Sequence, residues 1–391
     1  MTVPLRPLNS LCNVRIGRTP RRDSPEYWGG TGIWVTIGEL NGGEILESNE
    51  HISDVAMREV MPPPVPAGTL LFSFKLSIGK MATAGVPLYT NEAIAALEIR
   101  NTDELDRNYL RYALMATSSA AQTNHAVLGK VLNKAKVEAL PIPIRPIGEQ
   151  RHVVDLLSRA ETIVRVRGEA EAKAKEIIPA LFVEMFGDPG FNGRLERDEG
   201  RREAVNVSAF GSLGRLDRGR SRHRPRDAAH LYGGRYPLIQ TGEVARSDGA
   251  ITAYSQTYSD AGLAQSELWP AGTLCITIAA NIAETGVLKF DACFPDSVVG
   301  FLPGPRVRTE YIQQWLGFLQ PTLAAQAPQA AQKNINLAIL KNLQVPVPSL
   351  AEQDAFAAQA RTVRAMMGSQ KSASAYAGRA FQSLLAGVFH Q

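Results

Sequence analysis

The chain has 391 residues, 45% of them hydrophobic and 20% charged, a composition typical of a soluble protein with two or three packed domains. Three cysteines without a Cys-x-x-Cys pair indicate neither a disulfide framework nor a zinc site. No apolar run approaches the roughly 20 residues that span a bilayer, and no secretory signal opens the sequence. We therefore expect a cytoplasmic protein without a membrane partner.

The two halves of the sequence are copies of one another. Motifs of the first half recur 204 positions later. Further along the chain one residue is lost and the offset becomes 203, so that Glu149-Gln150 matches Glu352-Gln353, and this register then holds to the last residues. The sequence therefore predicts a tandem duplication. Three motifs carry it, each recurring 204 positions later: Tyr-Trp-Gly-Gly at 27–30 and Leu-Tyr-Gly-Gly at 231–234, Thr-Ile-Gly-Glu-Leu at 36–40 and Gln-Thr-Gly-Glu-Val at 240–244, and Pro-Ala-Gly-Thr-Leu at 66–70 and 270–274.

Each copy begins with a globular part. Short β-rich runs, each bounded by Gly, Pro, Asn or Asp, predict strands, and a helix follows them. We expect two α+β domains, at 1–145 and 205–348, each with a curled and mostly antiparallel sheet. The predicted strands and helix are 32–37, 69–74, 93–99 and 107–117 in the first copy, and 236–240, 273–278, 297–302 and 309–319 in the second.

A long helix ends each copy, after proline-rich breaks at 141–143 and 346–348. Apolar residues then recur at alternating steps of four and three, which predicts a heptad seam. We expect helices at 146–188 and 349–391, with a polar linker at 189–204, to pair as an antiparallel two-helix coiled coil kinked near Pro179. The seam residues are Val153, Leu157, Ala160, Val164, Ala174, Ile178, Leu181 and Met185, then Phe356, Ala360, Val363, Met367, Ala377, Phe381, Leu384 and Val388.

Two apolar residues of the first helix, Ile163 and Val166, lie off this seam. A pair of helices cannot cover the whole apolar circumference of both, so these side chains need another cover. We predict that they contact a protein partner.

Arginines gather at two places, although the net charge is only +4. Such runs attract polyanions, with nucleic acid as the leading candidate. One run alone is better explained as a solvated basic loop, but two runs at matched positions favour a role in binding. The runs are Arg15, Arg18, Arg21 and Arg22, and Arg215, Arg218, Arg220, Arg222, Arg224 and Arg226.

The motifs of DNA-modifying enzymes are missing from the sequence. It has no Asp/Asn-Pro-Pro-aromatic tetrapeptide for a flipped adenine, no phosphate-binding P-loop, no metal-binding histidine spacing and no nucleophile elbow. Glu39 and Glu243 recur at matched positions, and we interpret them as hydrogen-bonding groups at strand ends rather than as catalytic residues. We expect a binding protein without catalytic residues or metal.

The order of these motifs, their repetition and the attached helices resemble the specificity subunit of Type I restriction-modification systems. The resemblance covers essentially the full chain. It implies two target-recognition domains, each reading half of a bipartite double-stranded DNA sequence. It also implies that the paired helices hold two methyltransferase subunits, which bind S-adenosylmethionine, so no cofactor is expected in this chain. A translocating restriction subunit is a further possible partner.

This resemblance assigns roles to the basic and amide side chains, since Lys and Arg bind phosphates and reach guanine, while Asn and Gln pair with adenine. Trp28, Tyr27 and Tyr232 are interpreted as packing anchors at the base of the loops. The predicted phosphate contacts are Arg15, Arg18, Arg21, Arg22, Arg218, Arg220, Arg222 and Arg224. The predicted base contacts are Lys75, Lys80, Asn124 and Lys130 in the first half, and Asn281, Gln332 and Lys333 in the second.

Three alternatives stay open. The chain could be a self-contained nuclease or methyltransferase with unfamiliar motifs, which an assay without partners would reveal. It could be a coiled-coil scaffold whose globular parts bind protein, which the salt dependence of DNA binding would decide. It could also serve a related stand-alone methylation or phage-defence complex, and the sequence does not separate that from a Type I system.

Overall fold

The computed structural model describes residues 3–123, 132–187, 206–279, 282–326 and 336–389. They form two compact units, the first made of Met1–Gly168 with Ala373–Gln391 and the second of Glu169–Ser372. Two 40-residue helices, α5 (Ile147–Phe186) and α10 (Leu350–Phe389), each contribute to both units. We call the described residues before α5 the first head, and those between α5 and α10 the second head.

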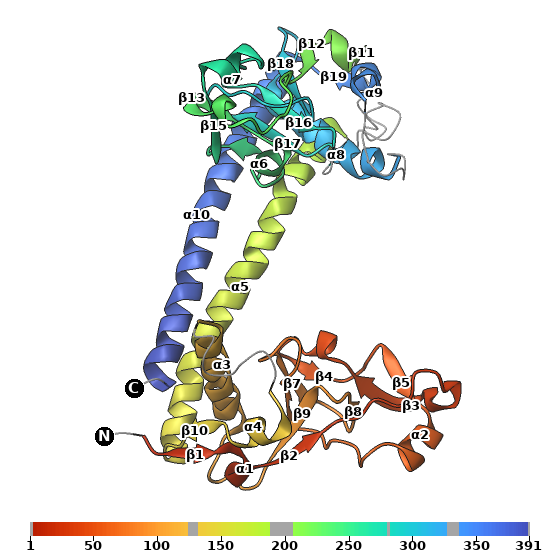
Figure 1. The fold of residues 1–391 in the computed structure, drawn as a ribbon, viewed down its shortest axis with the longest axis vertical. Coiled ribbons are helices and arrows are strands. Elements are labelled where there is room, and N and C mark those ends of the chain that lie inside the picture. Colours follow the sequence, from red (N-terminus) through yellow and green to blue (C-terminus); the bar gives the residue numbers. More distant parts are fainter. Residues whose placement is uncertain (1–2, 124–131, 188–205, 280–281, 327–335, 390–391) are drawn as a thin grey trace. The chain divides into compact units, whose positions relative to one another are not determined.

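The first head is built on a five-stranded sheet in the order β2-β9-β6-β7-β4, antiparallel except for the pair β4 and β7 (Figure 1). A three-stranded sheet, β5-β3-β8, and the pair β1-β10 lie beside it in the same head. The strands are β1 (Leu5–Pro7), β2 (Cys12–Ile16), β3 (Trp28–Val35), β4 (Glu44–Ile45), β5 (Glu50–Ile52), β6 (Leu70–Ser73), β7 (Met81–Ala84), β8 (Tyr89–Thr90), β9 (Ile94–Ile99) and β10 (Pro141–Pro143); the α-helices are α1 (Leu8–Leu11), α2 (Asp54–Glu59), α3 (Arg107–Thr123) and α4 (Lys134–Glu138).

Alternation along the central strands gives this sheet two buried faces. Leu70 and Phe72 of β6 belong to the core cluster that includes Tyr109 of α3, whereas Leu71 belongs to the cluster on the other face with Val35. The sheet is therefore packed on both sides. Side chains that bind a ligand must then come from the ends of its strands and from the loops that connect them.

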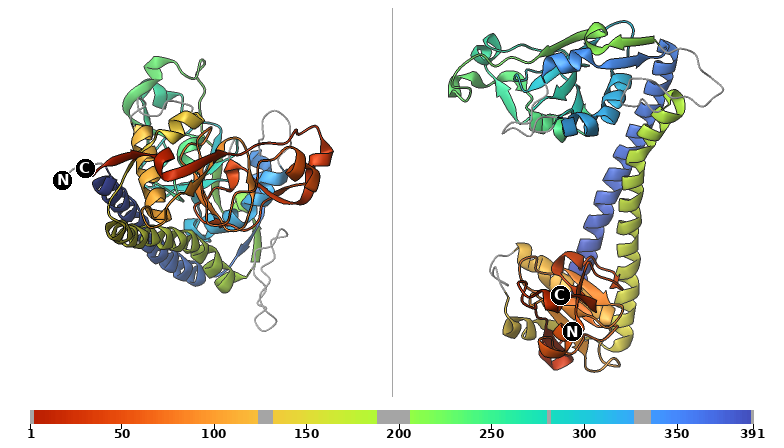
Figure 2. Two further views of the ribbon diagram at one scale, coloured as in Figure 1. Left: turned by 90° about the horizontal axis from the view of Figure 1, so that it is seen from below. Right: turned by 90° about the vertical axis from the view of Figure 1, so that its right-hand side faces the viewer.

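The second head, drawn from green to blue in Figure 2, repeats this topology. Its sheet has the order β12-β18-β16-β17-β14, and β13-β15 and β11-β19 form two further pairs. The duplication read from the sequence is thus a duplication of fold. The elements are β11 (Asn206–Ala209), β12 (Gly214–Arg218), β13 (Tyr232–Leu238), β14 (Ala250–Ile251), β15 (Gln256–Tyr258), β16 (Leu274–Thr277), β17 (Thr285–Leu288), β18 (Val298–Pro303), β19 (Gln344–Val347), α6 (Thr241–Ala245), α7 (Asp260–Ala264), α8 (Thr309–Gln326) and α9 (Leu337–Asn342).

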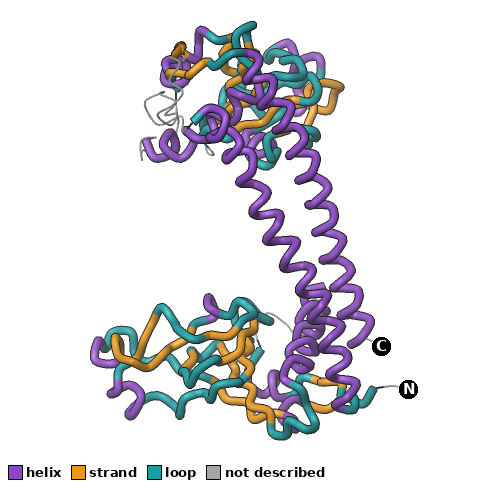
Figure 3. The backbone as a smooth tube through the Cα atoms, turned by 180° about the vertical axis from the view of Figure 1, so that it is seen from behind, coloured by secondary structure: helices purple, strands orange, loops and turns teal. Residues whose placement is uncertain are grey.

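Within each unit the two long helices run antiparallel (Figure 3). In the first unit Leu157 of α5 packs with Phe381 and Leu385 of α10. In the second unit Phe182 and Phe186 of α5 pack against Phe356 of α10, with ring centroids 5.5 and 5.6 Å apart. Helix α5 continues through Pro179 to Phe186.

The predicted seam is wrong near the C-terminal end of each long helix. Leu384 is 39% exposed, while Leu385 is buried. The buried residues recur at steps of four there, because each helix end packs on a head as well as on the other long helix. Phe182 and Phe186 contact Tyr311 of α8, and Phe381 and Phe389 contact Tyr112 and Tyr109 of α3.

A buried glutamine ties the start of each long helix to its head. The Gln150 amide donates to the carbonyls of Glu104 and Arg145 at 2.7 and 2.8 Å, and its oxygen accepts the Asp106 N–H at 2.9 Å. Gln353 makes the same three bonds in the second unit, donating at 3.1 and 2.9 Å and accepting at 2.8 Å. Both side chains are fully buried, so each head has a fixed orientation on its helix.

Candidate nucleic-acid interface

The first arginine segment has a fixed main chain and an exposed side chain. The Gly17 N–H donates to the Ile94 carbonyl at 3.2 Å, and the Arg18 N–H donates to the Thr90 carbonyl at 2.8 Å. A Cβ atom on Gly17 would lie 2.2 Å from the Thr90 carbonyl oxygen, so only glycine allows this approach. The Arg18 side chain is exposed and, within the described part of the chain, has no carboxylate partner.

Two tryptophans hold the rest of this segment. The Trp28 and Trp34 indole N–H groups donate to the carbonyls of Arg21 and Arg18, both at 3.0 Å. The rings meet edge to face at 5.1 Å, and the Arg22 guanidinium lies 4.1 and 4.8 Å from their centroids. The interpretation of Trp28 as an anchor is confirmed. Arg22 is also paired with Glu50, and Arg21 pairs with Asp23 at 2.9 Å.

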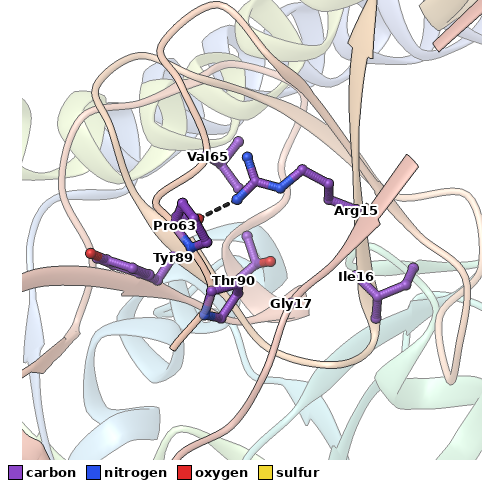
Figure 4. Close-up of a pocket in the computed structure, with 8 residues that line it drawn as sticks. Arg15, Ile16, Gly17, Pro63, Val65, Tyr89 and Thr90 are labelled. Atoms are coloured by element: carbon purple, nitrogen blue, oxygen red, sulfur yellow. Dashed lines mark hydrogen bonds between the residues drawn. The ribbon is translucent and has the colours of Figure 1, made fainter. Parts of the chain in front are cut away.

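Arg15 points into the head rather than away from it. Its guanidinium pairs with Glu98 at 2.5 Å and donates to the carbonyl of Pro63, at the edge of a small pocket that Tyr89 and Thr90 also line (Figure 4). The side chain is only 25% exposed. Arg15 thus supports the connection between strands, and of the four predicted cations in this segment Arg18 is the one best placed to meet a phosphate.

The hairpin between β6 and β7 brings two more predicted cations to the same region. Ser73 closes it: its N–H donates to the Lys80 carbonyl at 2.9 Å, and its hydroxyl accepts the Lys80 N–H at 2.9 Å. A hydrogen bond from Thr19 lowers the pKa of the Glu92 carboxyl, and the charges of Lys75 and Arg22 lower it further. Phe74, next to Lys75, donates its N–H to the Ala93 carbonyl at 3.1 Å, and Thr19 donates to the Glu92 carboxylate, so the hairpin and the arginine segment meet around Glu92.

The second head repeats the arginine segment in detail. The Gly219 N–H donates to the Val298 carbonyl at 2.9 Å, the Arg220 N–H donates to the Phe294 carbonyl at 3.1 Å, and a Cβ on Gly219 would lie 2.2 Å from the same Phe294 oxygen. The Tyr232 hydroxyl donates to the Arg226 carbonyl at 2.8 Å, just as the Trp28 indole N–H donates to the Arg21 carbonyl in the first head. Tyr232 is thus confirmed as an anchor. Arg18 and Arg220 are thus equivalent, a match that the two predicted runs did not resolve.

The arginines of the second run are engaged to different degrees. Arg220 lies 3.3 Å from Glu267, and Arg224 donates to the carbonyls of Ser221 and His223, both at 2.8 Å. Arg218 and Arg222 are exposed, and no carboxylate pairs with either among the residues that the structure describes. The second head therefore offers Arg218 and Arg222 as exposed cations without a carboxylate partner and Arg220 as an exposed but paired one, whereas the first head offers the exposed Arg18 and Lys80 and the half-buried Lys75.

Five of the predicted base contacts lie outside the described residues: Asn124, Lys130, Asn281, Gln332 and Lys333. Their assignment rests on the sequence alone.

The matched glutamates serve the main chain. Burial raises the pKa of the Glu39 carboxyl, but hydrogen bonds from Ser48, Thr36 and Asn49 outweigh it and lower that pKa. Glu243 accepts from the Gln240 N–H at 3.2 Å and from the Ser255 hydroxyl. Both therefore make the predicted hydrogen bonds, but as the third residues of capping boxes in the short helices that follow β3 and β13 rather than at the strand ends themselves.

Neither a metal centre nor a membrane segment emerges from the described ranges. No three of their His, Cys, Asp or Glu side chains are grouped to hold a metal ion. None of their helices combines the length and apolarity that a bilayer crossing requires.

Residues 3–173 and 203–359 match the family model for the Type I restriction modification DNA specificity domain. The chain belongs to this family. The two matched ranges cover both heads and the start of each long helix, so the repeat seen in the structure is a repeat of the specificity domain.

Two specificity subunits of Methanocaldococcus jannaschii are relatives. The Type I restriction enzyme MjaIX specificity subunit is 26% identical over 188 residues, which make up 46% of this chain and 42% of that subunit. The alignment thus spans less than half of that relative. The putative type I restriction enzyme MjaX specificity subunit is 22% identical over 332 residues, 80% of this chain and 75% of that subunit.

Solved structures show the same fold. A chain from work on the assembly and conformational transition of a type I R-M system has a TM-score of 0.65 and 18% identity, with 100% of this chain and 99% of that chain covered. The S subunit from M. genitalium has a TM-score of 0.55 and 14% identity, with 98% and 95% covered. The predicted fold class, two α+β domains with a two-helix coiled coil, is confirmed.

Proposed function

We propose that this specificity-domain chain reads a bipartite double-stranded DNA target, one half through each head. The observation that carries the proposal is the repeated glycine-arginine segment, which fixes the main chain at Gly17 and Gly219 and exposes the next side chain in both heads. Cations held this way supply affinity and register through phosphates, while neighbouring loops read base edges. The predicted base contacts are Lys75, Lys80, Asn124 and Lys130, and Asn281, Gln332 and Lys333.

Sequencing the methylated sites of cells that carry this chain with a methyltransferase partner tests the proposal. A bipartite motif is expected. Replacing residues 1–145 by the corresponding part of another family member should change one half of the motif and leave the other half and the gap unchanged. A chimera that altered both halves would contradict independent reading by the two heads.

The methyltransferase partner is proposed to dock on the long helices. Ile163 and Val166 are 52% and 50% exposed, and Leu156, seven residues before Ile163, is 42% exposed on the same face of α5. Solvent exposure of three large aliphatic side chains along one stripe leaves an apolar surface for another protein. We propose that two methyltransferase subunits bind there and on α10, that S-adenosylmethionine binds to them, and that a restriction subunit joins the complex.

Ile163→Asp and Val166→Asp should abolish co-purification with the methyltransferase, because each places a charge in the proposed interface. Ala172→Asp places the same charge at an exposed position nine residues after Ile163, on the opposite side of α5, and should leave the complex intact. Assembly that survives both interface variants would place the contact elsewhere.

The chain itself is proposed to be non-catalytic and to act in the cytoplasm. Purified chain incubated with S-adenosylmethionine, Mg²⁺ and DNA should neither methylate nor cut the DNA, whereas the complex with the methyltransferase should methylate it. Activity of the chain without a partner would favour a self-contained enzyme instead.

A further inference from the structure

One large apolar side chain projects into solvent where the cations of the first head gather. Leu76, at the tip of the hairpin between β6 and β7, is 91% exposed, the most of any large hydrophobic residue in the described ranges. Its φ is +57°, in the left-handed region that disfavours residues other than glycine and asparagine by about 1 kcal/mol. The hairpin therefore holds an apolar group outward at a cost in both solvation and backbone conformation.

The hairpin is not free to fold this side chain back. Gly79, with φ +94°, donates its N–H to the Ser73 carbonyl at 3.0 Å, and a Cβ there would lie 2.9 Å from the Ser118 Cβ of α3. Ile78 packs against the core of the head. The turn is thus seated on α3 with Ile78 inward and Leu76 outward, between the cations Lys75 and Lys80.

We propose that Leu76 reads the first half-site by contacting the 5-methyl group of a thymine in the major groove. The inference rests on the proposed DNA-binding function. The major groove admits a two-stranded ribbon, and the thymine methyl is the apolar group that its floor offers to a side chain. Lys75 and Lys80 on either side can bind phosphates or guanine edges, which seats the apolar tip between them. In the second copy the sequence places the shorter Ala280 at the matching position.

The test uses the full chain in complex with its methyltransferase, and duplexes that carry the methylated motif found in cells. Thymines of the half-site read by the first head are replaced one at a time by uracil, which removes only the methyl group. For the wild type, one replacement should weaken binding about fourfold, the effect of one methyl group leaving an apolar contact. For Leu76→Asn, which suits the left-handed conformation but is polar, the same replacement should have no effect.

Leu46→Ala provides the control, because Leu46 is a 61% exposed leucine of the same head, after β4 at the opposite end of the sheet from the hairpin tip. This variant should keep the uracil sensitivity of the wild type. Leu76→Met, which stays apolar, should keep most of it.

Two outcomes would overturn the proposal. Wild-type binding that is indifferent to uracil at every thymine of the half-site would remove the methyl contact. Enhanced fluorescence of 2-aminopurine in the bound duplex, lost in Leu76→Asn, would show instead a side chain wedged between base pairs. In both cases the wild type still binds the target, whereas failure of the proposed function would leave no binding to measure.

Discussion

The two heads share a fold but carry different residues at the ends of their central hairpins. In the first head Leu76 and Lys80 are exposed at the tip of the hairpin. In the second head the matching hairpin also turns apolar residues inward, with Ile278, Ile282 and Ala283 all at least 96% buried, and residues 280–281 at its tip lie outside the described residues. Ala283 keeps the left-handed φ of its counterpart Gly79, at +58° and +94° respectively. The left-handed conformation is therefore kept at this position, while the sequence changes from Leu76 to Ala280 at the tip and from Lys80 to Glu284 beside it.

The contacts that hold the main chain show the opposite behaviour. Gln150 and Gln353 make the same three hydrogen bonds, and the hydroxyls of Tyr109 and Tyr311 donate to equivalent proline carbonyls at 2.9 and 2.7 Å. Contacts that both heads share therefore hold the fold, whereas residues that differ between the heads are available to recognise a target. Substitutions at matched pairs can sharpen or break this distinction.

The largest effect is expected at the buried glutamines. Gln150→Leu and Gln353→Leu leave one N–H and two carbonyls without a partner in a buried site, which should lower the free energy of unfolding by about 3 kcal/mol in each case. Urea unfolding followed by circular dichroism measures this. Gln359→Ala, an exposed glutamine of α10, should have almost no effect. Unequal losses at the two glutamines would show that the two junctions are not architectural equivalents.

The matched glycines come next. Gly17→Ala and Gly219→Ala each place a Cβ 2.2 Å from a carbonyl oxygen, so the segment must shift, at a cost of roughly 2 kcal/mol in the free energy of unfolding. Gly168→Ala is the control, because it meets no atom within 4 Å in the middle of α5 and should stabilise the helix by up to about 1 kcal/mol. Thermal melting of the three variants would be enough, and tolerance of both alanines would contradict the proposed constraint.

The junctions differ at one further pair. In the first unit Arg111 binds Glu161 at 2.9 and 2.6 Å, and the Tyr112 hydroxyl donates to the same carboxylate at 2.8 Å. In the second unit Gln313 and Arg364 occupy the matching places, with 3.1 Å between the Gln313 oxygen and the Arg364 guanidinium. Burial lowers the pKa of Arg364, the sign of a desolvated cation.

Glu161→Gln should therefore lower the free energy of unfolding by about 1–2 kcal/mol, because it leaves Arg111, whose side chain is 15% exposed, without its counter-charge. Arg364→Met should leave that free energy unchanged or raise it. The sign of the pH dependence follows from the carboxyl. Burial raises the pKa of Glu161, but its bonds to Arg111 and Tyr112 lower it below the ordinary 4.5. Its stabilisation is present above pH 4.5 and is lost as the pH falls below that value. Urea titrations at pH 7 and pH 3.5 should show Glu161→Gln approaching the wild type at the lower pH; equal losses at both would contradict this.

The sequence predicted much of the architecture because the repeat itself carries structural information. The motif at 66–70 leads into β6 as predicted, and the helices predicted at 107–117 and 309–319 are the first parts of α3 and α8. Residues 182 and 186 were missed as seam positions because heptad spacing describes two helices alone, whereas these residues face Tyr311 as well. The equivalence of Arg18 and Arg220 was missed because their offset is 202 rather than 204, and only the bonds of Gly17 and Gly219 reveal it.

The residue types of the site could be predicted from the sequence, but which of these side chains are exposed and free of an ion pair could not. Arg15 and Arg18 look alike in the sequence, yet the half-buried Arg15 pairs with Glu98 whereas the exposed Arg18 extends from a fixed main chain. Local spacing cannot indicate an ion pair between residues more than 80 positions apart. Leu76 was also missed, because a single leucine between Lys75 and Ser77 gives no sign in the sequence that it is exposed, and only its positive φ and its exposure in the structure set it apart.

The smallest effect, and the most direct comparison of the two heads, is expected at the matched arginines. Arg18→Ala and Arg220→Ala should weaken DNA binding by the complex to a similar extent on target and unrelated sequences, because phosphate contacts carry no sequence information. Each should reduce the slope of log affinity against log salt by about 0.9. Glu267, which lies near Arg220, also pairs with Arg215 and so keeps a counter-charge when Arg220 is removed, and the loss of Arg220 should reduce affinity no more than the loss of Arg18. Arg100 is an exposed arginine that follows the last residue of β9, whereas the Gly17 segment lies at the first residue of that strand. Arg100→Ala should therefore change neither the affinity nor the slope. A loss confined to the target sequence would instead make Arg18 or Arg220 a base-reading residue, and the division between architectural backbone and exposed cations would then have to be redrawn for that head.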